Sequence, residues 1–411
     1  MSLEPFTDDD PIFRRESVLR DTYTPETLVE RDRELREFQN ALKPVVKGEI
    51  PKNIFLYGQT GVGKSIATEM VLDRLKQDQE NFDDLNVEVT YVLCKNLTSS
   101  YQVTVELVNT FREPENQISG TGHSHGAVLA KLWQHINDID ATHLLIVLDE
   151  IDSVGTDDDI LYQLPRANAN GKVDPNNVKL GVIGISNDFT FRDQLDARVQ
   201  DSLAEDEIHF PPYDSNQLRT ILHDRAGNAF VDGALADDVI PLCAAFAGQE
   251  TGSARQALKL LYKSGDLARS EGVSMVEERH VRAAQDLVEA GKAKDELEAL
   301  PSQSHLTLFA MLQMADEGLL PARSTDIYDF YDRAARAIDA DVKSIRTIRS
   351  RLSQLLMKGF LKKTQRNEGL NGGSFFLYEL DIREELIREV LQEDDRTKQL
   401  FSEGSKQSRI R

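Results

Sequence analysis

The octapeptide Gly58–Ser65 has the residue types and spacing of a phosphate-binding loop. It reads GQTGVGKS, which matches the pattern G-x-x-x-x-G-K-[ST] at every fixed position. Its glycines let the backbone curl so that successive N–H groups point at phosphate oxygens. Lys64 would then reach the β- and γ-phosphates of ATP, and the Ser65 hydroxyl would ligate Mg²⁺. The residues expected to hold the nucleotide are Gly58, Gln59, Thr60, Gly61, Val62, Gly63, Lys64, Ser65 and Ile66.

Two acids, Asp149 and Glu150, follow the apolar run Leu144–Leu148 and supply the second half of such a site. Asp149 would complete the Mg²⁺ shell with Ser65, and Glu150 would orient or deprotonate the attacking water. Adjacent acids at a strand end can also be a solvated edge, but these follow a run that predicts a buried strand. A hydride-transferring dinucleotide fold is a poorer alternative, because its GxGxxG loop lacks the Lys-Ser pair.

Three further polar residues have no clear role from their neighbours alone. Asn187 follows the apolar run GVIGIS and could bond the γ-phosphate or the attacking water, or simply form a turn with Asp188. Arg198 and Arg255 are isolated arginines, which are more often surface residues. The two histidines of GTGHSHG, residues 120–126, suggest a metal site, but no third ligand has suitable spacing, so a surface loop is favoured.

The residues around these motifs predict three structural parts. Up to residue 210, short apolar runs alternate with helical stretches, which is typical of a parallel α/β sheet with flanking helices. The predicted strands are 53–57, 87–93, 143–149, 180–186 and 207–210, and the turn-forming segment 157–177 is expected to be a loop. Only helical periods remain from 215 to 290. The predicted domains are an α/β nucleotide-binding core at 1–212, an all-helical domain at 213–299, a third domain at 300–395 and a polar tail at 396–411.

The third part contains a basic run that differs from the rest of the chain. From Lys343 to Arg366 there are eight Lys and Arg residues and no Asp or Glu, whereas the whole chain has a net charge of −22. Apolar residues at helical spacing form a stripe that would turn these cations outward. The stripe consists of Ile345, Ile348, Leu352, Leu355 and Leu356.

A basic helix followed by strands at 360–363 and 374–380 predicts a winged helix, which would lay the helix in a DNA major groove. Residues 365–373 would form the wing, with a hairpin tip at Asn371-Gly372-Gly373. We expect Arg346 and Arg349 to include a base reader, and the cations near the wing to contact phosphates. The alternative is a basic face that only offsets acidic neighbours. The expected DNA contacts are Lys343, Arg346, Arg349, Arg351, Lys362, Lys363 and Arg366.

Length and composition exclude several classes of protein. A chain of 411 residues with 40% hydrophobic residues predicts a globular protein of two or three domains rather than a disordered one. No apolar run reaches 18 residues and the start is acidic, so neither a membrane span nor a secretory signal is expected. Two distant cysteines favour reduced thiols in a cytosol. The charge of −22 argues against a basic coat and is typical of proteins adapted to molar salt.

The order of these motifs resembles that of AAA+ ATPases, and in particular of the archaeal origin-recognition initiators. These are relatives of the eukaryotic origin recognition complex and of cell division control protein six. The resemblance spans roughly residues 10 to 395, and the acidity suggests a haloarchaeal source. It rests on IGISNDFTFRDQLDARVQDSL and IHFPPY within residues 183–213, on TGSARQALKLL at 251–261, and on IFRRESVLRDTYTPETLVERDREL at 12–35.

The resemblance implies roles for residues that are ambiguous by themselves. Asn187 would be the sensor 1 residue, and Arg255 would be the sensor 2 arginine that reaches from the lid to the γ-phosphate. Tyr213 and Arg225 would line the nucleotide site, and the Tyr213 ring follows two prolines where it could stack on adenine. Arg198 resembles the arginine finger, which acts on the ATP of a neighbouring subunit.

The resemblance further implies an ATP-dependent initiator that binds duplex origin DNA and helps recruit or load the replicative helicase. Such a protein would self-associate on DNA in the cytoplasm, near the nucleoid, and would be a weak ATPase with Mg²⁺ whose ATP and ADP states act as a switch. A helical insertion within 97–126 would also touch DNA. Two alternatives remain: a winged-helix regulator with a structural nucleotide, and an AAA+ protein remodeller such as a clamp loader. Glu150 argues against the first, because a passive site needs no base, and the basic run argues against the second.

Overall fold

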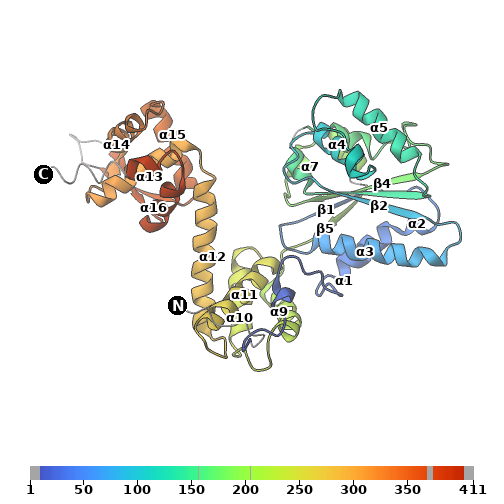
Figure 1. Cartoon of the computed structure of the whole chain (residues 1–411), viewed down its shortest axis with the longest axis horizontal. Helices are drawn as coiled ribbons and strands as arrows, with labels where there is room; N and C mark the ends of the chain where they lie inside the picture. Colours follow the sequence, from blue (N-terminus) through green and yellow to red (C-terminus); the bar gives the residue numbers. More distant parts are fainter. Residues whose placement is uncertain (1–9, 156, 204, 368–373, 402–411) are drawn as a thin grey trace. The chain divides into compact units, whose positions relative to one another are not determined.

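The structure is a computed structural model that describes residues 10–155, 157–203, 205–367 and 374–401 (Figure 1). The chain divides into two compact units, Met1–Ala284 and Gln285–Arg411. In the described residues, no helix is both long enough and apolar enough to cross a membrane. The domain boundaries after residues 212, 299 and 395 remain predictions.

The first unit contains the predicted parallel sheet. Its strands have the order β2-β3-β4-β1-β5, and each neighbouring pair is parallel. The bounds are β1 Ile54–Tyr57, β2 Val87–Leu93, β3 His143–Asp149, β4 Lys179–Ser186 and β5 Asp206–His209. β3 is buried along its whole length, as expected for a strand that is covered on both faces. The parallel α/β prediction is confirmed, and the strand ends differ from the predicted ends by at most one residue.

Helices cover both faces of this sheet (Figure 1). On one face lie α1 (Asp32–Ala41) and α3 (Lys64–Asp78), and on the other lie α4 (Ser100–Thr110) and α5 (His125–Asn137). Successive strand residues point to opposite faces. Leu56 therefore packs into the core that α3 shares, whereas Phe55 packs into the core that α4 and α5 share.

The segment 157–177 is not a loop throughout, and that prediction was wrong for part of its length. It contains the short helix α6 (Asp159–Gln163), on which Ile160 and Leu161 are fully buried. The Ser100 hydroxyl accepts a hydrogen bond from the Ile160 backbone N–H at 3.1 Å near the start of this helix. Turn formers dominate the segment, but the burial of two adjacent apolar side chains decides its local conformation.

The rest of the first unit is helical, as predicted. It comprises α9 (Ser215–Ala229), α10 (Val239–Glu250) and α11 (Ala254–Ser270), and α12 (Glu278–Glu298) follows. A capping box starts α9, because the Asp214 carboxylate accepts from the Gln217 backbone N–H and the Gln217 side chain accepts from the Asp214 N–H. The N-cap Asp214 directly follows Tyr213. The capping box therefore fixes the point at which the chain passes from the sheet to the helical part of the first unit.

The second unit has the arrangement of a winged helix. Its helices are α13 (Ser302–Asp316), α14 (Ser324–Ala337), α15 (Ile345–Met357) and α16 (Glu384–Glu393). Its antiparallel strands are β6 (Ala322–Arg323), β7 (Leu361–Asn367) and β8 (Ser374–Leu380), in the order β6-β8-β7. The two-residue strand β6 was not predicted, and the predicted hairpin tip at 371–373 lies outside the described residues.

The apolar stripe of α15 is buried as its spacing predicts. Ile348, Leu352 and Leu355 are fully buried, and Ile345 and Leu356 at the margins are half-buried. The opposite side of the helix is exposed to solvent, including Arg346 and Arg349. Helix α15 therefore exposes cations to solvent on one side, while its apolar side packs into the hydrophobic core of the second unit.

The excess of carboxylates leads to a prediction about salt. Asp and Glu outnumber Lys and Arg by 22, so exposed carboxylates repel one another unless salt screens them. Lowering KCl from molar to about 0.1 M lengthens the Debye length from about 3 Å to about 10 Å. We expect the melting temperature to fall over this range, and thermal melts at matched osmolarity would show it. A melting temperature that is indifferent to KCl would contradict the salt-adaptation hypothesis.

Candidate nucleotide site and nucleic-acid interface

The loop Gly58–Ser65 connects β1 to α3, as predicted. Gly61 has a φ of 81° and Gly63 a φ of 99°, which are backbone angles that favour glycine. A Cβ atom on Gly61 would lie 2.1 Å from the Ser253 hydroxyl oxygen, just before α11. The loop therefore needs glycine both for its curl and for its close approach to the helical part of the first unit.

Lys64 is the central cation of this loop. Its Nζ donates to the carbonyl oxygens of Gly58 and Gln59, each at 2.8 Å, and to Asn187 Oδ1 at 2.9 Å. The side chain is only 4% exposed, and burial lowers the pKa of Lys64 to about 8. The structure thus brings together the lysine and the asparagine, which are 123 residues apart in the sequence.

Asn187 is itself fixed by a second acid. Its backbone N–H donates to Asp152 Oδ1 at 2.9 Å, so the carboxylate of Asp152 is engaged at the end of β4. This contact holds the Asn187 side chain beside Lys64. The sequence alone allowed two roles for Asn187, a contact to the phosphate or water and a simple turn. Its position beside Lys64 favours the first role.

The predicted cation ligands also lie together. The Ser65 hydroxyl donates to Asp149 Oδ2 at 2.6 Å, and the Glu150 backbone N–H donates to Asp149 Oδ1 at 2.8 Å. Tyr91 donates to the same Asp149 Oδ2. Burial and the neighbouring Asp149 carboxylate raise the pKa of Tyr91, so its hydroxyl stays protonated. A hydroxyl beside a buried carboxylate is the kind of oxygen pair that suits Mg²⁺.

Glu150 has an uncommon backbone conformation. Its φ of 55° lies in the left-handed region, which non-glycine residues seldom occupy and which often marks functional sites. The residue lines the same cleft as Lys64 and Asp149. The residue that follows the end of β3 therefore contributes to the wall of the cleft.

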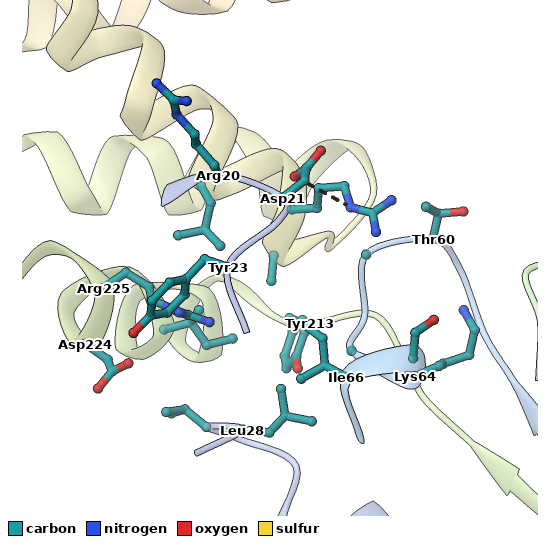
Figure 2. Close-up of a pocket in the computed structure, with 18 of the residues that line it drawn as sticks. Arg20, Asp21, Tyr23, Leu28, Thr60, Lys64, Ile66, Tyr213, Asp224 and Arg225 are labelled. Atoms are coloured by element: carbon teal, nitrogen blue, oxygen red, sulfur yellow. Dashed lines mark ion pairs between the residues drawn. The ribbon is translucent and has the colours of Figure 1, made fainter. Parts of the chain in front are cut away.

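These residues line one cleft that is open to solvent (Figure 2). The predicted residues among its walls are Thr60, Gly61, Gly63, Lys64, Ser65, Ile66, Asp149, Glu150, Asn187, Tyr213, Arg225 and Arg255. Gly58 and Gln59 instead contribute indirectly, because their carbonyl oxygens accept hydrogen bonds from Lys64. Val62 is fully buried. The glycine curl, the buried lysine and the Ser65–Asp149 pair fit a phosphate chain with a divalent cation.

The N-terminal segment forms a wall of this cleft that the sequence motifs did not reveal. The cleft is lined by Val18, Arg20, Asp21, Tyr23, Thr27, Leu28 and Val29, several of which Figure 2 labels. The Arg225 guanidinium lies over the Tyr23 ring at 4.7 Å, and Asp21 Oδ1 lies 3.8 Å from Arg255 Nε. None of these residues belongs to a motif with fixed spacing. The resemblance of residues 12–35 to the initiator family was therefore the only sequence feature that could have indicated this wall.

Tyr213 and Arg225, which the resemblance assigned to the site, are both buried there. Tyr213 is 2% exposed, burial raises its pKa to about 12, and the Arg31 guanidinium stacks on its ring at 3.6 Å. Arg31 also donates to Val62 O at 3.0 Å and to Pro211 O at 2.5 Å. Arg31, which sequence analysis missed, therefore ties the phosphate loop to the segment that leads into α9.

Two predicted features lie outside the cleft. Arg198 is exposed on α8 (Ala197–Leu203), 3.5 Å from Asp196, and its guanidinium lies 5.2 Å from the centre of the Tyr162 ring. His125 is the first residue of α5, and no group of three or more His, Cys, Asp or Glu side chains suited to a metal occurs within the described ranges. Residues 120–124 lie in no helix or strand, and helix α5 begins at His125, so part of the segment that was expected to be a loop is helical.

The basic run of the second unit divides into two groups. Lys343 is paired with Asp341, and Lys358 Nζ lies 3.9 Å from Glu296. Lys362 Nζ lies 3.6 Å from Glu379 and 3.8 Å from Asp381. For these three lysines the alternative of a basic face that offsets acidic neighbours has direct support.

The other cations of the run are arranged differently. Within the described residues, no ion pair involves Arg346, Arg349, Arg351, Lys363 or Arg366. Arg349 Nε donates to the Ser324 hydroxyl at 3.2 Å, Arg351 donates to Gln354 at 2.7 Å, and Lys363 lies 4.7 Å from the centre of the Phe376 ring. Among the residues that the structure describes, these five cations therefore differ from Lys343, Lys358 and Lys362, which each have an acidic partner.

Comparisons with known proteins agree with this geometry. Residues 50–187 match the family model of an AAA domain, residues 219–286 that of a Cdc6 AAA+ ATPase-type lid domain, and residues 295–390 that of a Cdc6 C-terminal winged helix domain. The chain is 55% identical to an ORC1-type DNA replication protein 1 of Haloarcula marismortui, over 98% of this chain and 97% of the relative. It is 36% identical to an ORC1-type DNA replication protein of Thermococcus kodakarensis, over 95% and 93%.

A solved structure extends the agreement to three dimensions. The Aeropyrum pernix ORC1 protein, determined in complex with DNA, matches with a TM-score of 0.78 and 32% identity, over 95% of this chain and 100% of that one. The AAA+ core, the helical lid and the winged helix expected from the sequence are all confirmed by these matches. The chain therefore belongs to the ORC1/Cdc6 family of AAA+ DNA replication proteins.

Proposed function

We propose that the chain is an ATP-dependent replication initiator that binds duplex origin DNA and helps recruit or load the replicative helicase. The observation that supports this most is the combination of a phosphate-binding cleft in the first unit with an outward-facing basic helix in the second. The DNA in the solved Aeropyrum pernix relative supports the same proposal. A clamp-loader-like remodeller is less favoured, because it would not need a winged helix that exposes arginines on α15.

In this proposal the cleft binds ATP and hydrolyses it slowly. Lys64 binds the β- and γ-phosphates, and Asn187 orients the γ-phosphate or the attacking water. Ser65 and Asp149 would hold Mg²⁺, which supplies charge neutralisation on the phosphates. Glu150 orients the water and accepts its proton.

The remaining predicted residues couple nucleotide to conformation. Arg255 is in the first turn of α11 and lines the cleft, and we propose that it senses the γ-phosphate. Tyr213 and Arg225 contribute to the wall that would receive the base. Arg198 is proposed to act on the ATP of a second copy on DNA, consistent with its exposure outside the cleft.

In the second unit, the exposed arginines of α15 are proposed to enter the major groove. Arg346 and Arg349 are the candidates for base reading, and Arg351, Lys363 and Arg366 for phosphate contact. Lys343 and Lys362 would contact DNA only after giving up an acidic partner. DNA affinity should therefore depend on fewer cations than the length of the basic run suggests.

Footprinting on genomic DNA at high KCl, with ATP and with ADP, tests the proposal. We expect protection of discrete duplex sites and a difference in the protected pattern between the two nucleotides. Adding the replicative helicase should extend or stabilise the footprint in the ATP state. Protection without any nucleotide effect would support the regulator with a structural nucleotide instead, and no protection at all would contradict DNA binding.

Replacing Lys64 with alanine should lower ATP affinity at least tenfold, which corresponds to about 1.4 kcal/mol. The ammonium group is buried and is held at the phosphate loop by the carbonyl oxygens of Gly58 and Gln59, so alanine removes a positioned positive charge. Calorimetry of ATP binding measures the effect. Lys52→Ala is a matched control, because Lys52 pairs with Asp206 at the surface and does not line the cleft. An unchanged ATP affinity in Lys64→Ala would contradict the assignment.

A further inference from the structure

We propose that Tyr91 is a positioning residue that fixes the Asp149 carboxylate in the orientation required to bind Mg²⁺. The proposal rests on the proposed function of the cleft and extends it to a residue on β2. Tyr91 belongs to no motif of the nucleotide site, and its side chain does not line the cleft. It acts through Asp149 and is not a catalytic residue.

The contacts of Asp149 are the first step of the argument. Asp149 is 5% exposed, so its orientation depends on protein partners more than on bulk water. Oδ1 accepts from the Glu150 backbone N–H at 2.8 Å, and Oδ2 accepts from Ser65 at 2.6 Å and from Tyr91. A carboxylate at neutral pH only accepts, so the Tyr91 hydroxyl is the donor in this contact.

The sheet register explains why Tyr91 reaches this atom. β2 and β3 are parallel neighbours in which Leu93 lies opposite Asp149 and Tyr91 lies opposite Val147. Because side chains alternate along a strand, all four point to the same face of the sheet. This is the face on which α3 lies, with Ser65 at its start. A long phenol side chain two residues before Leu93 can therefore extend along the face to the Asp149 carboxylate.

The Tyr91 contact differs from the other two in an important way. Ser65 would turn its hydroxyl oxygen to the cation in the proposed function, and the Glu150 N–H holds only Oδ1. Tyr91 also donates to Oδ2, and unlike Ser65 and Glu150 it has no other proposed role in the site. Without it, Oδ2 loses its remaining protein donor and only the Glu150 N–H on Oδ1 restrains rotation about the Cβ–Cγ bond, so the ligand geometry is less well defined. Outer partners of this kind typically contribute 10- to 100-fold to metal affinity or activity.

Tyr91→Phe tests the proposal because it removes only the hydroxyl. We expect the Mg²⁺ concentration for half-maximal stimulation of ATP binding to rise about tenfold, measured by calorimetry at a series of Mg²⁺ concentrations. ATP binding in the presence of EDTA should equal that of the parent, and the hydrolysis rate should recover at saturating Mg²⁺. A general structural defect would instead lower ATP binding with and without Mg²⁺.

Tyr101→Phe is the matched control. The Tyr101 hydroxyl is buried and has no hydrogen-bond partner among the described residues, so its removal should leave the Mg²⁺ dependence unchanged. An identical Mg²⁺ dependence in Tyr91→Phe and the parent would overturn the proposal for Tyr91 alone. Absence of any Mg²⁺ effect on ATP binding by the parent would instead overturn the proposed function of the cleft. Thermal melts of both variants confirm that the comparison is made between folded proteins.

Discussion

Glu150→Gln should lower ATP turnover on the order of a hundredfold while ATP remains bound. Glutamine preserves the size of the side chain and its ability to orient water, but it cannot accept a proton. Glu150 follows Asp149 directly, has a left-handed backbone conformation and lines the cleft. The substitution leaves the Glu150 N–H, which donates to Asp149 Oδ1, in place. Binding and chemistry should therefore separate.

The measurement pairs single-turnover release of phosphate with equilibrium binding of ATP. Asp152→Asn is the informative companion variant, because the Asp152 carboxylate accepts from the Asn187 backbone N–H. We expect a smaller loss of turnover from Asp152→Asn, since an amide oxygen can still accept that bond. Equal hydrolysis by Glu150→Gln and the parent would remove the base role from Glu150. A large loss in Asp152→Asn alone would transfer that role to Asp152.

The strands and the phosphate loop could be predicted because their signals are local. An apolar run such as Leu144–Leu148 can be buried on both faces only in a covered sheet. The Gly58–Ser65 pattern by itself specifies the backbone turn that binds phosphate. The carboxyl ends of parallel strands meet at one edge of the sheet. The proximity of Asp149 and Asn187 to Lys64 could therefore be predicted from the strand pattern alone. Local patterns were sufficient wherever a single strand or turn positions the side chain.

The missed residues depend on contacts between distant segments. Arg31 bonds to Val62 and Pro211, and Tyr91 reaches Asp149 only because β2 pairs with β3 in one register. Neither residue has neighbours that distinguish it from an ordinary surface arginine or strand tyrosine. The hydrogen bonds of such side chains become visible only when the partner segments are placed together.

The basic run shows a related limit. Counting charges from Lys343 to Arg366 cannot reveal which lysines are neutralised. The partners of Lys362 come from β8 and the residue after it, and the partner of Lys358 comes from α12. The antiparallel pairing of β7 with β8 places Lys362 directly opposite Glu379. The structure therefore changes the expected ranking of these cations, although the helix and its orientation agree with the sequence.

Removing Arg346, Arg349, Lys363 or Arg366, for which the described residues provide no ion pair, should weaken DNA binding in two distinguishable ways. A base-reading arginine, expected among Arg346 and Arg349, should cost about 1–3 kcal/mol at one base position when replaced by alanine. A phosphate-contacting cation should instead lower the slope of log K against log salt by about 1 for any duplex sequence. We expect this second effect for Lys363→Ala and Arg366→Ala.

Lys362→Ala is the matched control for this prediction. Lys362 is on the same strand as Lys363, but it already faces Glu379 and Asp381, so DNA contact would require these ion pairs to break. Its removal should change the salt slope by less than the removal of Lys363. Salt titrations of each alanine variant on origin and random duplexes, with ATPase activity recorded alongside, provide the comparison. ATPase activity should persist in all of them, because the nucleotide cleft is formed by the first unit. If every variant binds DNA like the parent, the run only offsets acidic neighbours, and the protein-remodeller alternative becomes the better account of the chain.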